Sequence, residues 1–175
     1  MEYREVCRRD GSMTGEIVEK HAPKRAGDYF RHVLLFLKME NSPPPGQGEG
    51  LYLVQQRSLK ARYFAGKWDV TGGGVQAGET PLHAAVREAK EELRLELQEA
   101  QLTLVKEYPV DWPDGTGLVI SAYACRIKLP DNGLSWDETE VNSAGVYPFS
   151  QFRRWVMDHN DEAFGRMMDW VEAHI

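Results

Sequence analysis

One run of the sequence constrains the fold more than any other, because it combines clustered glycines with a clear helix start. The run from Gly73 to Leu95 reads GGVQAGETPLHAAVREAKEELRL. Thr80 is a favourable N-cap residue, and Pro81 suits the first helical position, where its fixed φ and missing N–H cost nothing. The run therefore predicts a glycine-rich turn followed by a helix that begins near residue 80.

The predicted helix has one apolar stripe and one acidic face. Apolar residues spaced at i, i+3, i+4 and i+7 lie on one side of a helix and indicate burial. The stripe consists of Leu82, Ala85, Val86, Ala89 and Leu93. At about 100° per residue, Glu88, Glu91 and Glu92 share a face that points away from this stripe. We therefore expect three carboxylates outside the core, beside a tight glycine loop.

This arrangement of oxygens predicts a metal site. Mg²⁺ prefers oxygen ligands, usually one or two carboxylates together with waters and substrate phosphates. Glu88, Glu91 and Glu92 would supply such oxygens from one rigid element, and the carbonyl of Gly72 would add a further ligand where the backbone approaches closely. Arg87 lies one turn before Glu91 and is expected to pair with it. The expected ion is Mg²⁺, with Mn²⁺ as the alternative.

The spacing of the run resembles the Nudix box, in which a glycine, a glutamate, an Arg-Glu pair and a Glu-Glu pair recur at fixed intervals. The matching positions are Gly73, Glu79, Arg87, Glu88, Glu91, Glu92 and Leu95. Two positions depart from the pattern. Ala89 fills an apolar slot with a small side chain, and Arg94 stands where the family has its second glycine, so the end of the helix is in question.

The resemblance implies a function and a division of roles. It implies a metal-dependent pyrophosphohydrolase that cleaves a diphosphate linking a nucleoside, or another group, to a moiety X. Water would attack phosphorus with the help of bound metal. Arg87, Glu88 and Glu91 are then catalytic, whereas Gly73 and Glu79 stabilise the loop.

The group that accepts the proton of this water is open at this point. Some members of the family use the glutamate of the Arg-Glu pair, which is Glu88 here, and others use a glutamate from a distant loop. The segment WDETE carries Glu138 and Glu140 just before an expected strand at 145–149. Both are candidates for a distal base.

Residues 55–74, QQRSLKARYFAGKWDVTGGG, are expected to contact the substrate. Arg57 and Lys60 would meet phosphate charge, and Trp68 would flank a flat group unless it packs in the core. This segment also resembles isopentenyl diphosphate isomerase. That enzyme needs a cysteine soon after the tryptophan, and residues 69–74 contain none. An isomerase-like enzyme and a non-catalytic nucleotide-binding Nudix module are the two alternatives.

Composition favours one globular domain over residues 1–175. With 42% hydrophobic residues the chain can bury a core, and a formal net charge of −6 argues against a nucleic-acid partner. Two cysteines do not make a disulfide framework, and no apolar run is long enough to span a membrane. The N-terminus lacks the apolar core of a signal peptide. We expect a cytoplasmic enzyme that acts on a small-molecule diphosphate.

The order of elements predicts an α+β fold in which helices flank a mixed β-sheet, and the Nudix α/β/α sandwich fits this order. Strands are expected at 3–8, 13–19, 30–39, 51–56, 102–110, 118–127 and 145–149, and helices after residue 80, at 150–159 and at 161–175. The last helix has an apolar stripe that would pack on the sheet or against a second copy of the chain in a homodimer.

Overall fold

The structure is a computed structural model that describes residues 1–175. In chain order the elements are β1 (Tyr3–Cys7), β2 (Met13–Glu19), β3 (Tyr29–Met39), β4 (Leu51–Arg57), β5 (Trp68–Asp69), β6 (Thr71–Gly74), α1 (Pro81–Leu93), a short 3-10 helix (Glu99–Gln101), β7 (Thr103–Asp111), β8 (Gly117–Ile127), β9 (Val141–Pro148), α2 (Phe149–Val156) and α3 (Glu162–His174).

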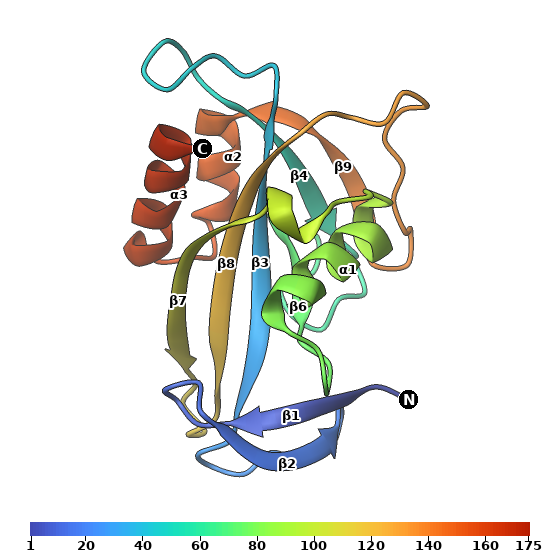
Figure 1. Cartoon of the computed structure of the whole chain (residues 1–175), viewed down its shortest axis with the longest axis vertical. Coiled ribbons are helices and arrows are strands. Elements are labelled where there is room, and N and C mark those ends of the chain that lie inside the picture. Colours follow the sequence, from blue (N-terminus) through green and yellow to red (C-terminus); the bar gives the residue numbers. More distant parts are fainter.

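A mixed sheet lies between two layers of helices, with α1 on one face and α2 and α3 on the other (Figure 1). The central strand β3 runs parallel to β8 along its whole length. Three antiparallel strands share its opposite edge, because β1 pairs with residues 29–30, β6 with residues 32–35 and β4 with residues 37–38. These layers confirm the predicted α+β fold of the Nudix type.

The central strand is almost continuously apolar because helices cover both of its faces. Val33 and Leu35 are buried beneath α1. On the opposite face Phe36 contacts Phe152 of α2 and Phe164 of α3, with ring centroids 6.4 and 5.8 Å away. Burial on both sides fixes α1 rigidly against the sheet, which is what a site built on that helix requires.

The main disagreement with the sequence prediction concerns the glycine-rich segment. The predicted turn is instead the strand β6, hydrogen-bonded to β3, and it is preceded by the two-residue strand β5. Among Gly72, Gly73, Gly74 and Gly78, only Gly78 has a positive φ, of 79°. Strand β9 also begins at Val141, four residues before its predicted start.

The predicted start of α1 is confirmed. The Thr80 hydroxyl accepts a hydrogen bond from the His83 N–H at 3.1 Å, and Pro81 is the first helical residue. At the other end, Arg94 adopts the left-handed conformation, with φ 55° and ψ 27°. This conformation closes many helices, but it normally belongs to glycine. The departure from the family pattern therefore places an arginine under backbone strain.

We expect Arg94→Gly to stabilise the protein by about 1 kcal/mol, because the left-handed conformation costs an L-residue roughly 1–2 kcal/mol. For a chain of this size the melting temperature should rise by about 2–4 °C, measured by circular dichroism. Arg94→Ala is the matched control. It removes the same exposed contact with Asp137 but keeps the strained backbone, so it should give no increase. Equal melting temperatures for the two variants would contradict this explanation.

A buried polar network ties α3 to the sheet. The Nζ of Lys38, which is 1% exposed, lies 3.0 Å from the Glu172 carboxylate. The same carboxylate accepts hydrogen bonds from the Tyr52 hydroxyl at 2.7 Å and the Gly50 N–H at 2.6 Å. The buried charge of Lys38 is thus neutralised by one carboxylate, and further hydrogen-bond donors hold that carboxylate in place. Neither α3 nor any other helix is long and apolar enough to cross a membrane.

Candidate active site

The glycines of β6 let the strand pass directly beside α1. A Cβ on Gly73 would overlap the carboxylate of Glu88, and one on Gly74 would overlap the guanidinium of Arg4. No side chain larger than a hydrogen atom fits at either position without displacing a charged group. The close approach expected of this segment is therefore present, although the backbone is extended.

Arg87 connects the start of α1, its middle and the glycine strand. Its guanidinium donates hydrogen bonds to Glu79 at 2.9 Å, to Glu88 and Glu91 at 2.8 Å each, and to the carbonyl of Gly74 at 2.9 Å. The predicted pairing with Glu91 is present. Such a set of charge-assisted bonds fixes three carboxylates relative to β6.

Glu79 is part of the loop and not of the acidic cluster. Besides its two bonds from Arg87, it accepts a hydrogen bond from the Gln76 N–H at 3.0 Å. Burial alone would raise the pKa of Glu79, but the bonds from Arg87 and Gln76 lower it below its usual value. Glu79 is thus an ionised side chain fully engaged in holding the loop before α1.

The three acids of α1 do not share one environment, which corrects the prediction that their face lies outside the core. Glu88 and Glu92 are 8% and 4% exposed, whereas the Glu91 side chain is 53% exposed. Burial raises the pKa of Glu88, and burial together with the Glu88 charge raises the pKa of Glu92 to about 8. Strand β6 covers these two acids, and its glycines leave room for them because they have no Cβ atom.

Glu92 is held by two strands of the sheet. Its Oε2 accepts hydrogen bonds from the Gln55 side chain of β4 at 2.8 Å and from the Gly72 N–H of β6 at 3.2 Å. Sequence reasoning missed Gln55. The available signal was a glutamine within the otherwise apolar start of β4, where a buried amide needs a polar partner.

The donor set fits a hard divalent cation. No three His, Cys, Asp or Glu side chains are grouped as a ready-made metal cage. Glu88 and Glu92 are nevertheless two buried acids that share one cation, since Arg87 bonds to Glu88 and not to Glu92, and the charge of Glu88 raises the pKa of Glu92. Mg²⁺ commonly binds through one or two carboxylates and keeps waters for the remaining positions. Glu88 and Glu92 match that requirement, with Glu91 nearby at the surface.

The structure separates the two candidates for a distal base. The charge of Glu140 raises the pKa of both Glu88 and Glu92, so Glu140 lies close to this pair. Glu138 is not among the groups that chiefly shift either pKa. The preceding residue Asp137 donates its N–H to the Glu92 carbonyl at 2.9 Å, which attaches this loop to the end of α1.

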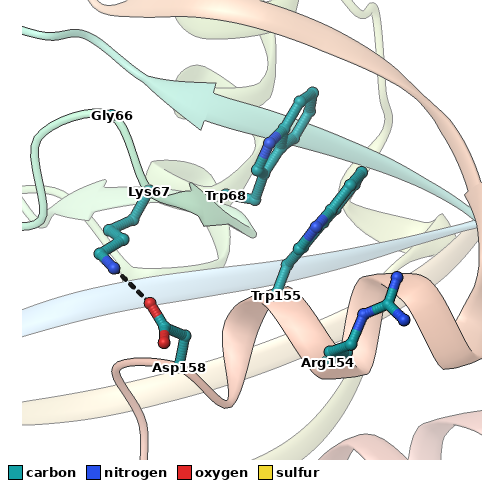
Figure 2. A pocket seen from close by; sticks show the side chains of 6 residues that line it. All are labelled: Gly66, Lys67, Trp68, Arg154, Trp155 and Asp158. Carbon is teal, nitrogen blue, oxygen red and sulfur yellow. Dashed lines mark hydrogen bonds and ion pairs between the residues drawn. The ribbon is translucent and has the colours of Figure 1, made fainter.

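Trp68 lies on the opposite side of the sheet from α1, against α2. Figure 2 shows its indole lying face to face with Trp155, and the ring centroids are 4.6 Å apart with planes 14° apart. Tyr147 closes the cluster edge-on at 5.2 Å. Lys67 forms an ion pair with Asp158 beside a cavity of about 350 Å³ (Figure 2). This geometry favours packing over the predicted substrate contact of Trp68.

The two predicted phosphate-binding cations lie at the start of the β4–β5 loop. Arg57 donates from Nε to the Tyr63 carbonyl at 3.1 Å, and neither Arg57 nor Lys60 forms an ion pair with a carboxylate. The loop begins beside Glu140, because the Ser58 N–H donates to the Glu140 carbonyl at 2.9 Å. Both cations therefore extend from a segment that adjoins the acidic cluster.

The thiols are remote from this chemistry. Cys7 and Cys125 are free and buried, Cys7 in β1 and Cys125 in β8. Burial raises the pKa of Cys125 to about 12, and Cys7 donates to the Tyr29 carbonyl. Neither provides the thiol that the isomerase-like alternative requires near residues 69–74.

Several solved structures resemble the fold of this chain. A protein of Deinococcus radiodurans has a similar structure, with a TM-score of 0.68 at 19% identity over 99% of this chain and 100% of that one. The NUDIX domain of Shewanella oneidensis NrtR, in complex with ADP ribose, gives 0.62 at 14% identity over 87% and 92%. The dihydroneopterin triphosphate pyrophosphohydrolase of E. coli gives 0.59 at 17% identity over 81% and 95%.

These likenesses show the fold, and the family follows from the sequence. No curated protein matches the chain in sequence. The model of the NUDIX domain, however, matches residues 31–170, which include β3, the glycine strand and all of α1. The chain therefore belongs to the NUDIX domain family, which confirms the predicted Nudix hydrolase of phosphoanhydride bonds.

Proposed function

We propose that the protein is a Mg²⁺-dependent pyrophosphohydrolase that cleaves a diphosphate joined to a second group. The observation that carries this proposal is the pair Glu88 and Glu92, two buried carboxylates beside a glycine strand, of which Arg87 bonds only to Glu88. A divalent ion bound there would polarise phosphate oxygens and acidify a bound water. One similar structure is a complex with ADP ribose, and another is named as an enzyme that acts on dihydroneopterin triphosphate. Both compounds contain phosphoanhydride bonds.

Each residue of the site then has a chemical task. Glu88 and Glu92 hold the ion, with Glu91 and the Gly72 carbonyl as further oxygen donors. Arg87 keeps Glu88 and Glu91 in position through its hydrogen bonds. We assign the acceptance of the water's proton to Glu140, since it is the loop acid that lies close to the metal-binding pair.

The proposed function is tested with a panel of diphosphates in the presence of Mg²⁺, of Mn²⁺ and of EDTA. The panel contains nucleoside triphosphates, nucleotide sugars, dinucleoside polyphosphates, coenzyme A and isoprenoid diphosphates. We expect phosphate or nucleotide release from at least one compound with metal, and none with EDTA. Absence of cleavage across the whole panel at saturating Mg²⁺ would overturn the proposal and favour a binding module without catalysis.

We further expect Mg²⁺ to bind more tightly as the pH rises from 6 to 8. The pKa of Glu92 is raised to about 8 by burial and by Glu88, so metal binding must displace a proton below that pH. In EDTA the folded protein holds this proton and the unfolded chain does not, so stability should decrease as the pH rises from about 4.5 to 8. Thermal unfolding and Mg²⁺ titration at pH 6 and 8 measure both effects. An unchanged pH dependence in Glu92→Gln would contradict the assignment to this residue.

A further inference from the structure

Three cations near the β4–β5 loop have no acidic partner, although the chain has 27 acidic and 21 basic residues. Lys24, Arg57 and Arg62 make no ion pair with any carboxylate. Lys24 lies near Arg4 and Arg62, and His32 lies near Arg4 and Arg57. Burial and then the charges of Arg4 and Arg62 lower the pKa of Lys24, while burial and then Arg4 and Arg57 lower that of His32 to about 4. Asp114 offsets part of this charge at Lys24, and the remaining excess of positive charge indicates an anionic ligand.

Two aromatic rings face each other beside these cations. Tyr63 of the β4–β5 loop and Trp112 of the β7–β8 turn have centroids 6.4 Å apart and planes 27° apart. By comparison, Trp68 and Trp155 stack directly on each other, with centroids 4.6 Å apart. Because carbon atoms pack best at about 3.5–4 Å, a flat ring held between two others spans about 7 Å from the first to the third. The centroids of Tyr63 and Trp112 are thus farther apart than those of two rings in direct contact. Their separation is close to the distance across three stacked rings.

The surroundings of the pair favour a ligand that is both flat and anionic. The Nζ of Lys24 lies 4.4 Å from the Trp112 centroid, and the Cζ of Arg62 lies 5.4 Å from that of Tyr63. Tyr63 is 53% exposed, and its loop neighbours Leu59 and Phe64 are 69% and 51% exposed. Such clustering of exposed large apolar side chains on one loop is typical of a binding surface.

The β4–β5 loop is anchored at both ends and adjoins the acidic pair. At its start, Arg57 lies in β4 two residues after Gln55, whose side chain donates a hydrogen bond to Glu92. At its end, Lys67 pairs with Asp158 after α2, and the Phe64 ring lies tilted against that of His159 with centroids 4.7 Å apart. On the other side, the Arg4 guanidinium lies directly against Gly74, and the preceding residue Gly73 lies directly against Glu88. Arg4 and Arg57 therefore lie on segments that adjoin the acidic pair, whereas Lys24 and Arg62 lie against the two rings.

We propose that Tyr63 and Trp112 bind the base of a nucleotide between their rings, and that Lys24 and Arg62 bind its phosphate charge. This inference rests on the proposed function, because it supplies the group that is attached to the cleaved diphosphate. It selects nucleotides over isoprenoid diphosphates, whose aliphatic chains gain no stacking with the two rings.

The test is calorimetric titration of ADP, GDP, CDP, UDP, isopentenyl diphosphate and inorganic pyrophosphate into the protein with Mg²⁺. We expect at least one nucleotide to bind about tenfold tighter than pyrophosphate, and isopentenyl diphosphate to bind no tighter, since stacking of a base on an aromatic side chain is worth about that factor or more. Tyr63→Leu combined with Trp112→Leu should remove this advantage while pyrophosphate affinity stays within about twofold. Tyr63→Phe combined with Trp112→Phe should retain it.

Trp170→Leu is the matched control, because this tryptophan is also partly exposed and stacked, on His174 in the last helix. It should leave every affinity unchanged. The inference is overturned if no nucleotide binds tighter than pyrophosphate, or if the Leu double variant binds nucleotides as the wild type does. Stacking-dependent binding without metal-dependent cleavage would overturn the proposed function alone, whereas cleavage without such binding would overturn this inference alone.

Discussion

Glu92→Gln is expected to lower Mg²⁺-dependent turnover by at least about a hundredfold. Glutamine keeps an oxygen that can accept the bond from the Gly72 N–H, but it removes the negative charge that balances a divalent ion. Because the metal provides most of the charge stabilisation in such chemistry, a weakened metal site should reduce the rate far more than the stability. The measurement is the initial rate of product release on the best compound of the diphosphate panel, over a range of Mg²⁺ concentrations.

Glu96→Gln is the appropriate control for this variant. It is the same substitution four residues later, on a side chain that is 77% exposed and pairs only with Lys90. Its rate should stay within about twofold of the wild type. A folded Glu92→Gln protein with normal turnover would remove Glu92 from the metal site, and with it the main support for the proposed function.

Glu172→Ala is expected to destabilise the protein by about 3–5 kcal/mol, because it leaves the charge of Lys38 buried without a partner. The Tyr52 hydroxyl and the Gly50 N–H lose their acceptor in the same step. For a chain of this size the melting temperature should fall by roughly 10 °C, and urea denaturation should shift to lower concentration without a change in slope.

Two further variants show whether the buried charge is the cause. Glu162→Ala removes a side chain that is 93% exposed from the same helix and should change stability by no more than about 0.5 kcal/mol. Lys38→Met added to Glu172→Ala should recover most of the loss, since no buried charge is then left unpaired. If the double variant is less stable than Glu172→Ala, packing and not charge explains the network.

Local signals made α1 and the long strands predictable. Thr80 and Pro81 define the helix start from within the sequence, and the apolar run of β3 identifies a strand that is covered on both faces. The segment Thr71–Gly74 was not predicted as a strand, because glycine is unfavourable within strands and nothing local supplies the pairing energy. It becomes β6 only because β3 offers it a hydrogen-bonding edge.

The acids of the site were predictable by type and spacing but not by environment. A helical wheel places Glu88, Glu91 and Glu92 on one face, yet burial depends on what lies over that face. Here β6 covers Glu88 and Glu92 and leaves Glu91 in solvent. Likewise, the difference between Glu138 and Glu140 depends on how the loop attaches to the end of α1, which is a tertiary contact.

The shared edge of β3 has a mechanical consequence. Strands β4 and β6 both pair with β3 but not with each other, so the sheet has a seam between them. Gln55 from one strand and Gly72 from the other donate to the same oxygen of Glu92, and this carboxylate closes the seam. One oxygen of Glu92 therefore serves sheet cohesion and, under the proposed function, metal binding, so a replacement at position 92 must satisfy both demands.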